Sequence, residues 1–313
     1  MSEPLPVEAD GLVKTYGEVV AVDHVDLAVE PGDVYGYLGP NGAGKTTSLR
    51  MMLGLIRPTH GSVRLFGRDP LLKGAKALDG VAGFVEGPTF YPYLSGHKNL
   101  CLLADYDEPG SRARIDEVLE LVELRDRAKD RVGGYSHGMR QRLGIAAALL
   151  RSPRLLLLDE PTTGLDPAGM RDMRGLVRRL AGEGITIMLS SHLLNEVEEL
   201  CNRVAIIRTG RIVYQGCLGD LLATATSGYR LRATEPERAR LLCLSHAGIE
   251  DVTVVDGQIR FSGDETAVAA LSVALGQARI GVTALIPETA SLEDLFIGLT
   301  GGESSDHDRE AVA

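Results

Sequence analysis

The sequence predicts an α/β fold in which short buried strands are followed by helices. One observation is the run from Val34 to Leu55, where an apolar strand, a glycine-rich loop and a helical pattern follow one another. The second is a pair of later apolar runs, Arg154–Glu160 and Ile185–Leu189, each followed or ended by polar residues. Because the carboxyl ends of parallel strands meet at one edge of a sheet, we expect these polar residues beside the loop.

The N-terminal segments alternate apolar and polar residues, as half-exposed strands do. Val7–Lys14 and Val19–Val29 therefore predict an antiparallel β edge, with a turn at Tyr16 and Gly17. The Tyr16 ring, upstream of the glycine-rich loop, can stack on a nucleotide base or pack on the sheet. The pattern alone leaves both roles open.

The glycine-rich loop, Gly39–Thr46, has the spacing G-x-x-x-x-G-K-T. Its glycines let the backbone turn tightly and present N–H groups to a polyphosphate, and the helix that follows adds the positive end of its dipole. We expect Lys45 to reach the β- and γ-phosphates and the Thr46 hydroxyl to hold Mg²⁺. A chance glycine-rich turn is the alternative, which the strand-to-helix context disfavours. The candidate nucleotide ligands here are Gly39, Asn41, Gly42, Gly44, Lys45, Thr46 and Thr47.

An aromatic loop follows two further predicted strands, Val63–Phe66 and one that ends at Glu86. This loop contains the sequence GPTFYPYLSG, with Phe90, Tyr91 and Tyr93, and its two prolines keep it out of regular helix. The aromatic side chains either fill the core or form a groove that a partner protein contacts.

A helical subdomain is predicted over about residues 87–154. Leu100–Lys129 has a helical period, and its apolar positions form one face: Ile115, Val118, Leu119, Val122 and Leu124. Gly133 and Gly134 end this stretch. Ser136 is then the expected N-cap of a new helix over Arg140–Leu150.

Acidic residues end the apolar strand at 154–160. We expect Asp159 to orient the Mg²⁺ shell, and Glu160, on the opposite side of the pleat, to polarise the attacking water. His192 follows the next buried strand at the same edge, where its imidazole can contact the γ-phosphate; a structural histidine is the alternative. A proline-bounded turn and a basic helix over Ala168–Ala181 connect the two strands.

Together these motifs resemble the nucleotide-binding subunit of ABC transporters, over about Val7 to Asp220. The matching motifs occur in the family's order: Tyr16 at the adenine-stacking position, Gly39–Thr46 as Walker A, Tyr135–Met139 at the signature position, Leu155–Asp159 as Walker B, Glu160 as the catalytic glutamate, Gly164–Asp166 as the D-loop and His192 as the switch histidine. The resemblance implies ATP and Mg²⁺ as cofactors, with Glu160, His192 and Lys45 as catalytic residues. It also implies that Asp166 contributes to the nucleotide site.

Two motifs depart from the family's pattern. The signature, usually L-S-G-G-Q, reads YSHGM here and keeps Ser136 and Gly138. In the family these two positions bind the γ-phosphate of ATP held by the other subunit. Glu86 stands where the family usually has a glutamine, so it is a candidate Mg²⁺ ligand. Glutamate adds a charge and donates no hydrogen bond, so we expect stronger metal binding and altered positioning of water.

The resemblance implies an ATPase that works as a head-to-tail homodimer. The Glu86 position, the aromatic loop, the signature and a C-terminal SLEDLF segment together resemble the ABC-2 exporter ATPases of antibiotic and peptide resistance, which pair with a separately encoded permease. In that family the loop after Glu86 contacts the permease, which favours the partner role of Phe90, Tyr91 and Tyr93. A soluble ABC ATPase acting on ribosomes or nucleic acid is the alternative; such proteins usually have two cassettes or a long coiled coil.

Composition narrows the class further. Lys+Arg 33 against Asp+Glu 43 gives a net charge of −10, without a basic block, so no nucleic-acid partner is expected. The four widely spaced cysteines are typical of a reduced, cytosolic protein. The N-terminal residues lack the apolar core of a signal peptide, and no run approaches the ~18 apolar residues of a spanning helix. We expect a cytoplasmic protein held at the inner face of the membrane by the permease.

Length and a change of character predict two domains. The 313 residues suffice for an ATP-binding domain over 1–226 and a small α+β domain over 227–300. In the second domain, strands are expected at Tyr229–Ala233, Val252–Val255, Gln258–Phe261 and Val282–Ile286, and helices at Glu235–Ala247, Glu265–Gln277 and Ser291–Leu299. Its expected role is regulatory or dimer-supporting. The polar tail over 301–313 is expected to be disordered.

Overall fold

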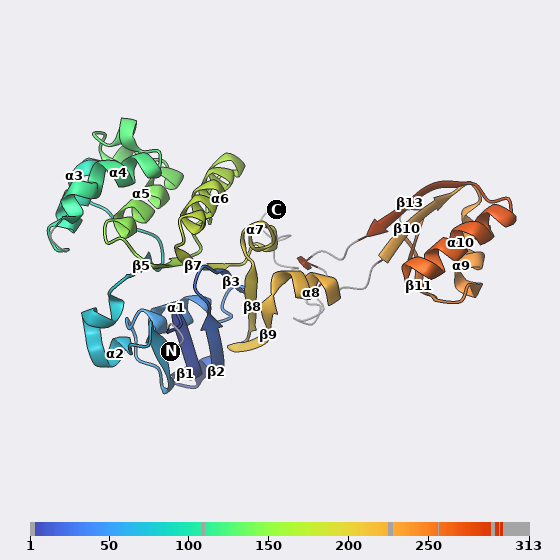
Figure 1. Cartoon of the computed structure of the whole chain (residues 1–313), viewed down its shortest axis with the longest axis horizontal. Helices are drawn as coiled ribbons and strands as arrows, with labels where there is room; N and C mark the ends of the chain where they lie inside the picture. The colour runs from blue at the N-terminus through green and yellow to red at the C-terminus, as the bar shows by residue number, and fades with distance from the viewer. Residues whose placement is uncertain are drawn as a thin grey trace, which may run out of the picture. The chain divides into compact units, whose positions relative to one another are not determined.

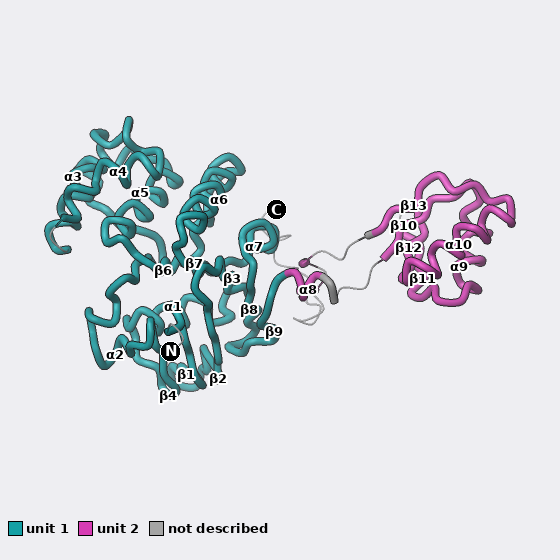
Figure 2. Tube along the Cα trace, in the orientation of Figure 1, with its two compact units in different colours: residues 1–218 teal, residues 219–313 magenta. Residues whose placement is uncertain are grey.

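The chain forms two compact units, residues 1–218 and 219–313, in this computed structural model (Figure 2). The structure describes residues 4–107, 110–224, 228–255, 257–288, 292–293 and 295–296. The division between the units falls before the predicted boundary after residue 226.

A six-stranded sheet forms the centre of the first unit, with the strand order β5-β6-β7-β3-β8-β9. The strands are β3 (Val34–Leu38), β5 (Val81–Phe84), β6 (Leu155–Asp159), β7 (Thr186–Ser191), β8 (Arg203–Arg208) and β9 (Arg211–Cys217). All neighbours are parallel except β8 and β9. The predicted runs at 34–38, 154–160 and 185–189 are therefore central parallel strands. Their carboxyl ends lie at one edge.

The predicted antiparallel strands pair with one another in a separate three-stranded sheet, in the order β2-β1-β4. These strands are β1 (Val7–Tyr16), β2 (Val19–Val29) and β4 (His60–Leu65). Helix α1 (Lys45–Met52) follows β3, and its Leu49 and Met52 share one buried cluster with Val25 of β2 and Tyr37 of β3. This core fixes the helix between the two sheets (Figure 1).

The helical subdomain consists of short helices rather than one long helical stretch over 100–129. These are α3 (Gly96–Ala104), η2 (Ser111–Arg114), α4 (Ile115–Leu121), η3 (Arg125–Arg127), η4 (Val132–Gly134) and α5 (His137–Leu149). The predicted apolar face from Ile115 to Leu124 is buried. The segment is helical, as predicted, and Glu123, which adopts φ 59 after α4, turns the chain between two of its helices. Figure 1 shows α3, α4 and α5 grouped beyond the β5 side of the sheet.

The remaining helices of the first 224 residues are α2 (Pro70–Lys73), η1 (Gly74–Leu78), α6 (Pro167–Gly182), α7 (Leu194–Leu200) and α8 (Leu218–Thr224). Helices α6 and α7 flank β7 along the chain, which matches the predicted strand–helix alternation. Across the part of the chain that the structure describes, no helix combines the length and apolarity needed to cross a membrane.

The second unit is a four-stranded antiparallel sheet, in the order β11-β12-β10-β13, with two helices. The elements are β10 (Gly228–Ala233), α9 (Pro236–Ser245), β11 (Ile249–Val255), β12 (Gln258–Gly263), α10 (Glu265–Gln277) and β13 (Val282–Glu288). Its core contains Leu231, Cys243, Phe261 and Leu271. The predicted helix at 291–299 lies largely outside the described residues, and the tail at 301–313 lies wholly outside them.

Candidate active site

The loop between β3 and α1 needs glycine at both of its ends for steric reasons. A Cβ on Gly39 would lie 2.4 Å from the backbone oxygen of Ile207, and one on Gly44 would lie 2.4 Å from that of Ala21. Gly44 also adopts φ 107, which L side chains rarely adopt. Gly42 has φ 79 and open space around its Cβ position, so there the conformation alone favours glycine.

Lys45 lies inside this loop with only 5% of its surface exposed. Its Nζ donates hydrogen bonds to the carbonyl oxygens of Gly39 (2.6 Å) and Pro40 (3.2 Å). The same Nζ lies 3.2 Å from Oε1 of Glu160, at the end of β6. The loop therefore holds a buried cation at the position where the sequence predicts contact with phosphates.

Thr46 and Asp159 come together although β3, which precedes the Thr46 helix, and β6, which ends at Asp159, are not neighbours. β7 lies between these two strands, and α1 carries Thr46 across it. The Thr46 hydroxyl donates to Oδ2 of Asp159 at 3.0 Å. Ser190, in β7, donates to Oδ1 of Asp159 at 2.5 Å and accepts from the backbone N–H of Glu160 at 3.0 Å. Sequence reasoning missed Ser190. The sequence signal at this position is that Ser190 directly follows the run Ile185–Leu189, whereas its contact with Asp159 depends on the position of β7 between β3 and β6.

Glu160 does not continue the pleat of β6, contrary to the expectation above. The strand ends at Asp159, and Glu160 adopts φ 49 in the left-handed region. This turn directs its carboxylate toward the loop and β7, where Oε2 accepts from the Thr163 hydroxyl (2.7 Å) and lies 2.5 Å from Nδ1 of His192. Lys45, Glu160 and His192 thus form one cluster.

The pKa of Glu160 reflects opposing influences. Burial raises it, but the hydrogen bond from Thr163, the charge of Lys45 and the interaction with His192 together hold the pKa below its ordinary value of 4.5. Glu160 is therefore an anion at neutral pH, as a residue that orients and polarises water must be.

A second polar group missed by sequence reasoning lies behind this cluster. Glu196 of α7 is 2% exposed, and its Oε2 accepts from the hydroxyls of Thr162 (2.5 Å) and Ser191 (3.2 Å). Thr162 lies two residues after Glu160, and Ser191 directly precedes His192. The Glu196 carboxyl group therefore joins the two chain segments that carry the catalytic candidates.

The predicted metal ligands are only partly brought together. Thr46 and Asp159 offer a hydroxyl and a carboxylate, the oxygen donors that Mg²⁺ prefers. Glu86 instead forms an ion pair with Arg50 of α1, with 65% of its side chain exposed. Within the described ranges no group of three or more His, Cys, Asp or Glu side chains could hold a metal ion. Thr46 and Asp159 fit Mg²⁺; the role of Glu86 stays a prediction.

The signature residues and Asp166 lie together in a cavity of about 410 Å³. Ser136 caps α5, its Oγ accepting from the Met139 N–H at 3.2 Å, as predicted. Asp166 caps α6 by accepting from the Gly169 N–H at 2.9 Å. Ser136, Gly138 and Asp166 all line this cavity, whose lining contains none of the phosphate-loop residues. Within one chain, the two predicted parts of the nucleotide site are thus separate.

The remaining aromatic candidates are on the surface. Tyr16 ends β1 with 48% exposure, and the Lys14 ammonium lies 5.0 Å from its ring centroid. Tyr91 and Tyr93 are 55% and 65% exposed, with ring centroids 5.7 Å apart, so they do not fill the core. Phe90 lines a separate groove of about 440 Å³ with Leu103 and Tyr106. These positions agree with a contact surface.

This site defines a P-loop protein that binds a nucleoside triphosphate, and comparisons with known proteins identify its family. The family model described as "ABC transporter" matches residues 22–163. The bacitracin transport ATP-binding protein of Bacillus licheniformis is 40% identical over 298 residues, covering 95% of this chain and 97% of that protein. The daunorubicin/doxorubicin resistance ATP-binding protein of Streptomyces peucetius is 35% identical over 320 residues, covering 98% and 96%.

Solved structures show the same fold. An ATP-binding subunit of an ABC transporter matches with a TM-score of 0.62 at 28% identity, covering 70% of this chain and 92% of that chain. A dimeric ATP-binding cassette bound to ADP and Pi matches with a TM-score of 0.61 at 27% identity, covering 68% and 98%. The chain belongs to the family of ABC transporter ATP-binding proteins, which are ATPases coupled to transport. The predicted fold, the ATPase activity and the resemblance to ABC-2 exporter ATPases are confirmed.

Proposed function

We propose that this ATPase drives the export of a drug, antibiotic or peptide through a separately encoded permease at the cytoplasmic face of the membrane. The cluster of Lys45, Glu160 and His192 beside Thr46 and Asp159 carries the proposal, because it supplies the groups that ATP hydrolysis needs. The similar proteins support the direction of transport: they are transport or resistance proteins for bacitracin and daunorubicin, and a Nod factor export protein.

Each residue has a definite task in this mechanism. Lys45 and the loop N–H groups neutralise and hold the β- and γ-phosphates, which requires Lys45 to exchange its carbonyl partners for phosphate oxygens. Thr46 and Asp159 would hold Mg²⁺, which supplies further charge neutralisation. Glu160 orients and polarises the attacking water, and His192, which contacts Glu160, is placed to donate to the γ-phosphate.

The site is completed by a second copy of the chain. Ser136 and Gly138 lie at the N-terminus of the 13-residue helix α5, which suits them to bind an anion, but their cavity contains no phosphate-loop residue. In a head-to-tail homodimer, this helix end of one chain would meet the ATP on the loop of its partner. ATP binding then closes the dimer and hydrolysis opens it. Tyr16, Asn41 and Thr47 would contact the nucleotide on the loop side.

The substitution Glu160→Gln tests this mechanism. It removes the anion but keeps the shape of the side chain, so ATP should still bind while hydrolysis falls about 10²- to 10⁴-fold. A stable dimer should then accumulate with ATP, as measured by size-exclusion chromatography with light scattering. Glu120→Gln, at an exposed position on α4, is the matched control and should behave as the wild type. Wild-type turnover in Glu160→Gln would remove Glu160 from this role.

A further inference from the structure

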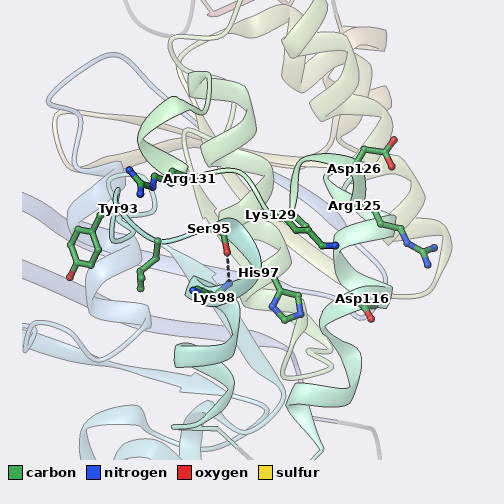
Figure 3. Close-up of a pocket in the computed structure, with 11 residues that line it drawn as sticks. Tyr93, Ser95, His97, Lys98, Asp116, Arg125, Asp126, Lys129 and Arg131 are labelled. Carbon is green, nitrogen blue, oxygen red and sulfur yellow. Dashed lines mark hydrogen bonds between the residues drawn. The ribbon is translucent and has the colours of Figure 1, made fainter.

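A cavity of about 800 Å³ on the helical subdomain is rich in positive charge (Figure 3). Its basic lining residues are His97 and Lys98 at the start of α3 and Arg125, Lys129 and Arg131 in the segment after α4. Asp116 and Asp126 are the acidic lining residues. This concentration of basic side chains contrasts with the net charge of −10 for the whole chain.

Three of these basic groups are available to a partner. Among the described residues, the side chains of Lys98, Lys129 and Arg131 form no ion pair or hydrogen bond, and all three residues are exposed. Arg125 is paired with Glu120, with 2.6 Å between Nη1 and Oε2. The cavity therefore holds positive charge that the chain does not itself neutralise.

The backbone of α3 does not supply the attraction for an anion here. The first N–H groups of this helix already have acceptors, with Gly96 bonded to the Asp130 oxygen (3.3 Å) and His97 to the Ala128 oxygen (2.9 Å). The Lys98 N–H is bonded to the Ser95 hydroxyl, which Figure 3 shows at the cavity wall. Recognition in this cavity must come from the side-chain cations.

The cavity is continuous with the aromatic surface that we assign to the permease. Tyr93 lines the cavity and pairs with the ring of Tyr91. The buried amide of Asn99 fixes Tyr91, accepting from its N–H at 2.9 Å and donating to its carbonyl at 3.1 Å. One residue before Tyr91, Phe90 lines the apolar groove. An apolar groove, an aromatic pair and a basic cavity thus follow one another along the same short loop.

We propose that the basic cavity receives an acidic segment of the permease's cytoplasmic face. This segment places an apolar side chain in the groove beside Phe90, crosses the Tyr91–Tyr93 pair and sets carboxylates against Lys98, Lys129 and Arg131. The inference rests on the proposed function and adds the chemistry of the partner. A protein segment suits the cavity better than an anionic lipid surface, because Asp116 and Asp126 would repel uniform negative charge while a segment of mixed side chains can pair with both signs.

The cavity lies beside the stretch of chain that leads into α5, the helix that carries the signature residues. The chain at 92–97 is hydrogen-bonded to the chain at 128–133, through Val132 N–H to the Leu94 oxygen (2.9 Å) and Gly133 N–H to the Pro92 oxygen (2.8 Å). Ser136 follows three residues later. A permease segment bound to Lys129 and Arg131 therefore contacts the stretch of chain that leads to Ser136 and Gly138, the predicted γ-phosphate ligands.

The double charge reversal Lys98→Glu/Lys129→Glu tests the proposal. The probe is the transmembrane permease that co-purifies with the wild-type chain, reconstituted in nanodiscs of neutral lipid. We expect at least a tenfold weaker binding of the variant and a smaller loss of binding on raising the salt concentration, while ATP hydrolysis by the free protein stays at the wild-type rate. Lys73→Glu/Lys76→Glu, the same charge change at α2 and η1, is the matched control and should bind as the wild type.

The outcomes separate the two proposals. Equal binding of permease by the wild type and the Lys98→Glu/Lys129→Glu variant would overturn the docking proposal. So would a loss of binding only to vesicles that contain phosphatidylglycerol, which would make the cavity a lipid site. Absence of ATP hydrolysis by the folded wild-type protein would overturn the proposed function instead.

Discussion

Removing the Glu196 carboxyl group should destabilise the first unit and loosen the cluster of Lys45, Glu160 and His192. In Glu196→Ala, the Thr162 hydroxyl loses its hydrogen-bond acceptor while remaining 3% exposed. Ser191 loses one of its bonds but keeps the Leu193 N–H at 2.9 Å. The main cost is therefore one buried, unsatisfied hydroxyl together with one weaker lost bond.

The magnitude follows from these contacts. A buried polar group left without a partner costs about 1–3 kcal/mol, and a lost net hydrogen bond about 1 kcal/mol. We expect the free energy of unfolding to fall by about 2–4 kcal/mol in Glu196→Ala. For a unit of 218 residues, this corresponds to a decrease in Tm of about 4–16 °C. Glu198→Ala, an exposed position on the same helix, should change stability by less than about 0.5 kcal/mol.

Thermal unfolding followed by circular dichroism measures both variants, since the chain has no tryptophan for fluorescence. A double-mutant cycle with Thr162→Val should then give a coupling energy of about 1–2 kcal/mol between the two side chains. A Tm for Glu196→Ala equal to that of Glu198→Ala, or a coupling energy near zero, would show that the Thr162–Glu196 bond does not stabilise the fold.

Three further measurements test other features. Gly144→Ala should lower the free energy of unfolding by about 1–3 kcal/mol, because its Cβ would lie 2.5 Å from a proline ring carbon. The control Gly175→Ala, whose Cβ would have nothing within 4 Å, should raise that free energy by about 0.5–1 kcal/mol. Equal shifts of the two variants in urea denaturation would contradict the packing at Gly144. The lowered pKa of Glu160 contributes stability that is present above its ordinary value of 4.5 and is lost as the pH falls through the folded-state pKa. The difference in Tm between the wild type and Glu160→Gln should therefore shrink in acid. A difference that stays constant with pH would refute this. Burial raises the pKa of Cys243 to about 11, which leaves its thiol unreactive at neutral pH. Maleimide labelling followed by mass spectrometry should therefore modify the exposed Cys217 and spare Cys243. Equal labelling rates would contradict the burial of Cys243 in the core of the second unit.

The central strands could be predicted because their sequences are unambiguous. The four leucines over 155–158 are all fully buried, and an apolar run of that length between polar residues suits a parallel strand covered on both faces. The phosphate loop was equally clear, since its spacing appears between a strand and a helix. In both cases, the residues that favour the local secondary structure are also the ones that the position in the fold requires.

The geometry of the candidate site could not be predicted at the same level. Glu196 lies in the segment NEVEEL, where three glutamates suggest a solvated helix face, and only the positions of Thr162 and Ser191 make one of them a buried acceptor. Ser190 likewise gains its role because β7 lies between β3 and β6. Both roles depend on strand order, which periodicity does not contain. The exposed ion pair of Glu86 with Arg50 also follows from the meeting of distant segments.

The left-handed backbone at Glu160 explains how two adjacent acids make different contacts at one edge of the sheet. In an extended strand, the side chains of Asp159 and Glu160 would point to opposite faces of the sheet, and only one could reach the phosphate loop. With φ 49 at Glu160, Asp159 contacts Thr46 while Glu160 contacts Lys45 from the same edge. A non-glycine residue in this region costs of order 1 kcal/mol or more, so it must be maintained by the hydrogen bond that the Glu160 N–H donates to Ser190 and by the contacts of its carboxylate with Thr163 and His192. The backbone turn, rather than the pair of acids alone, therefore brings one carboxylate to Thr46 and its neighbour to Lys45.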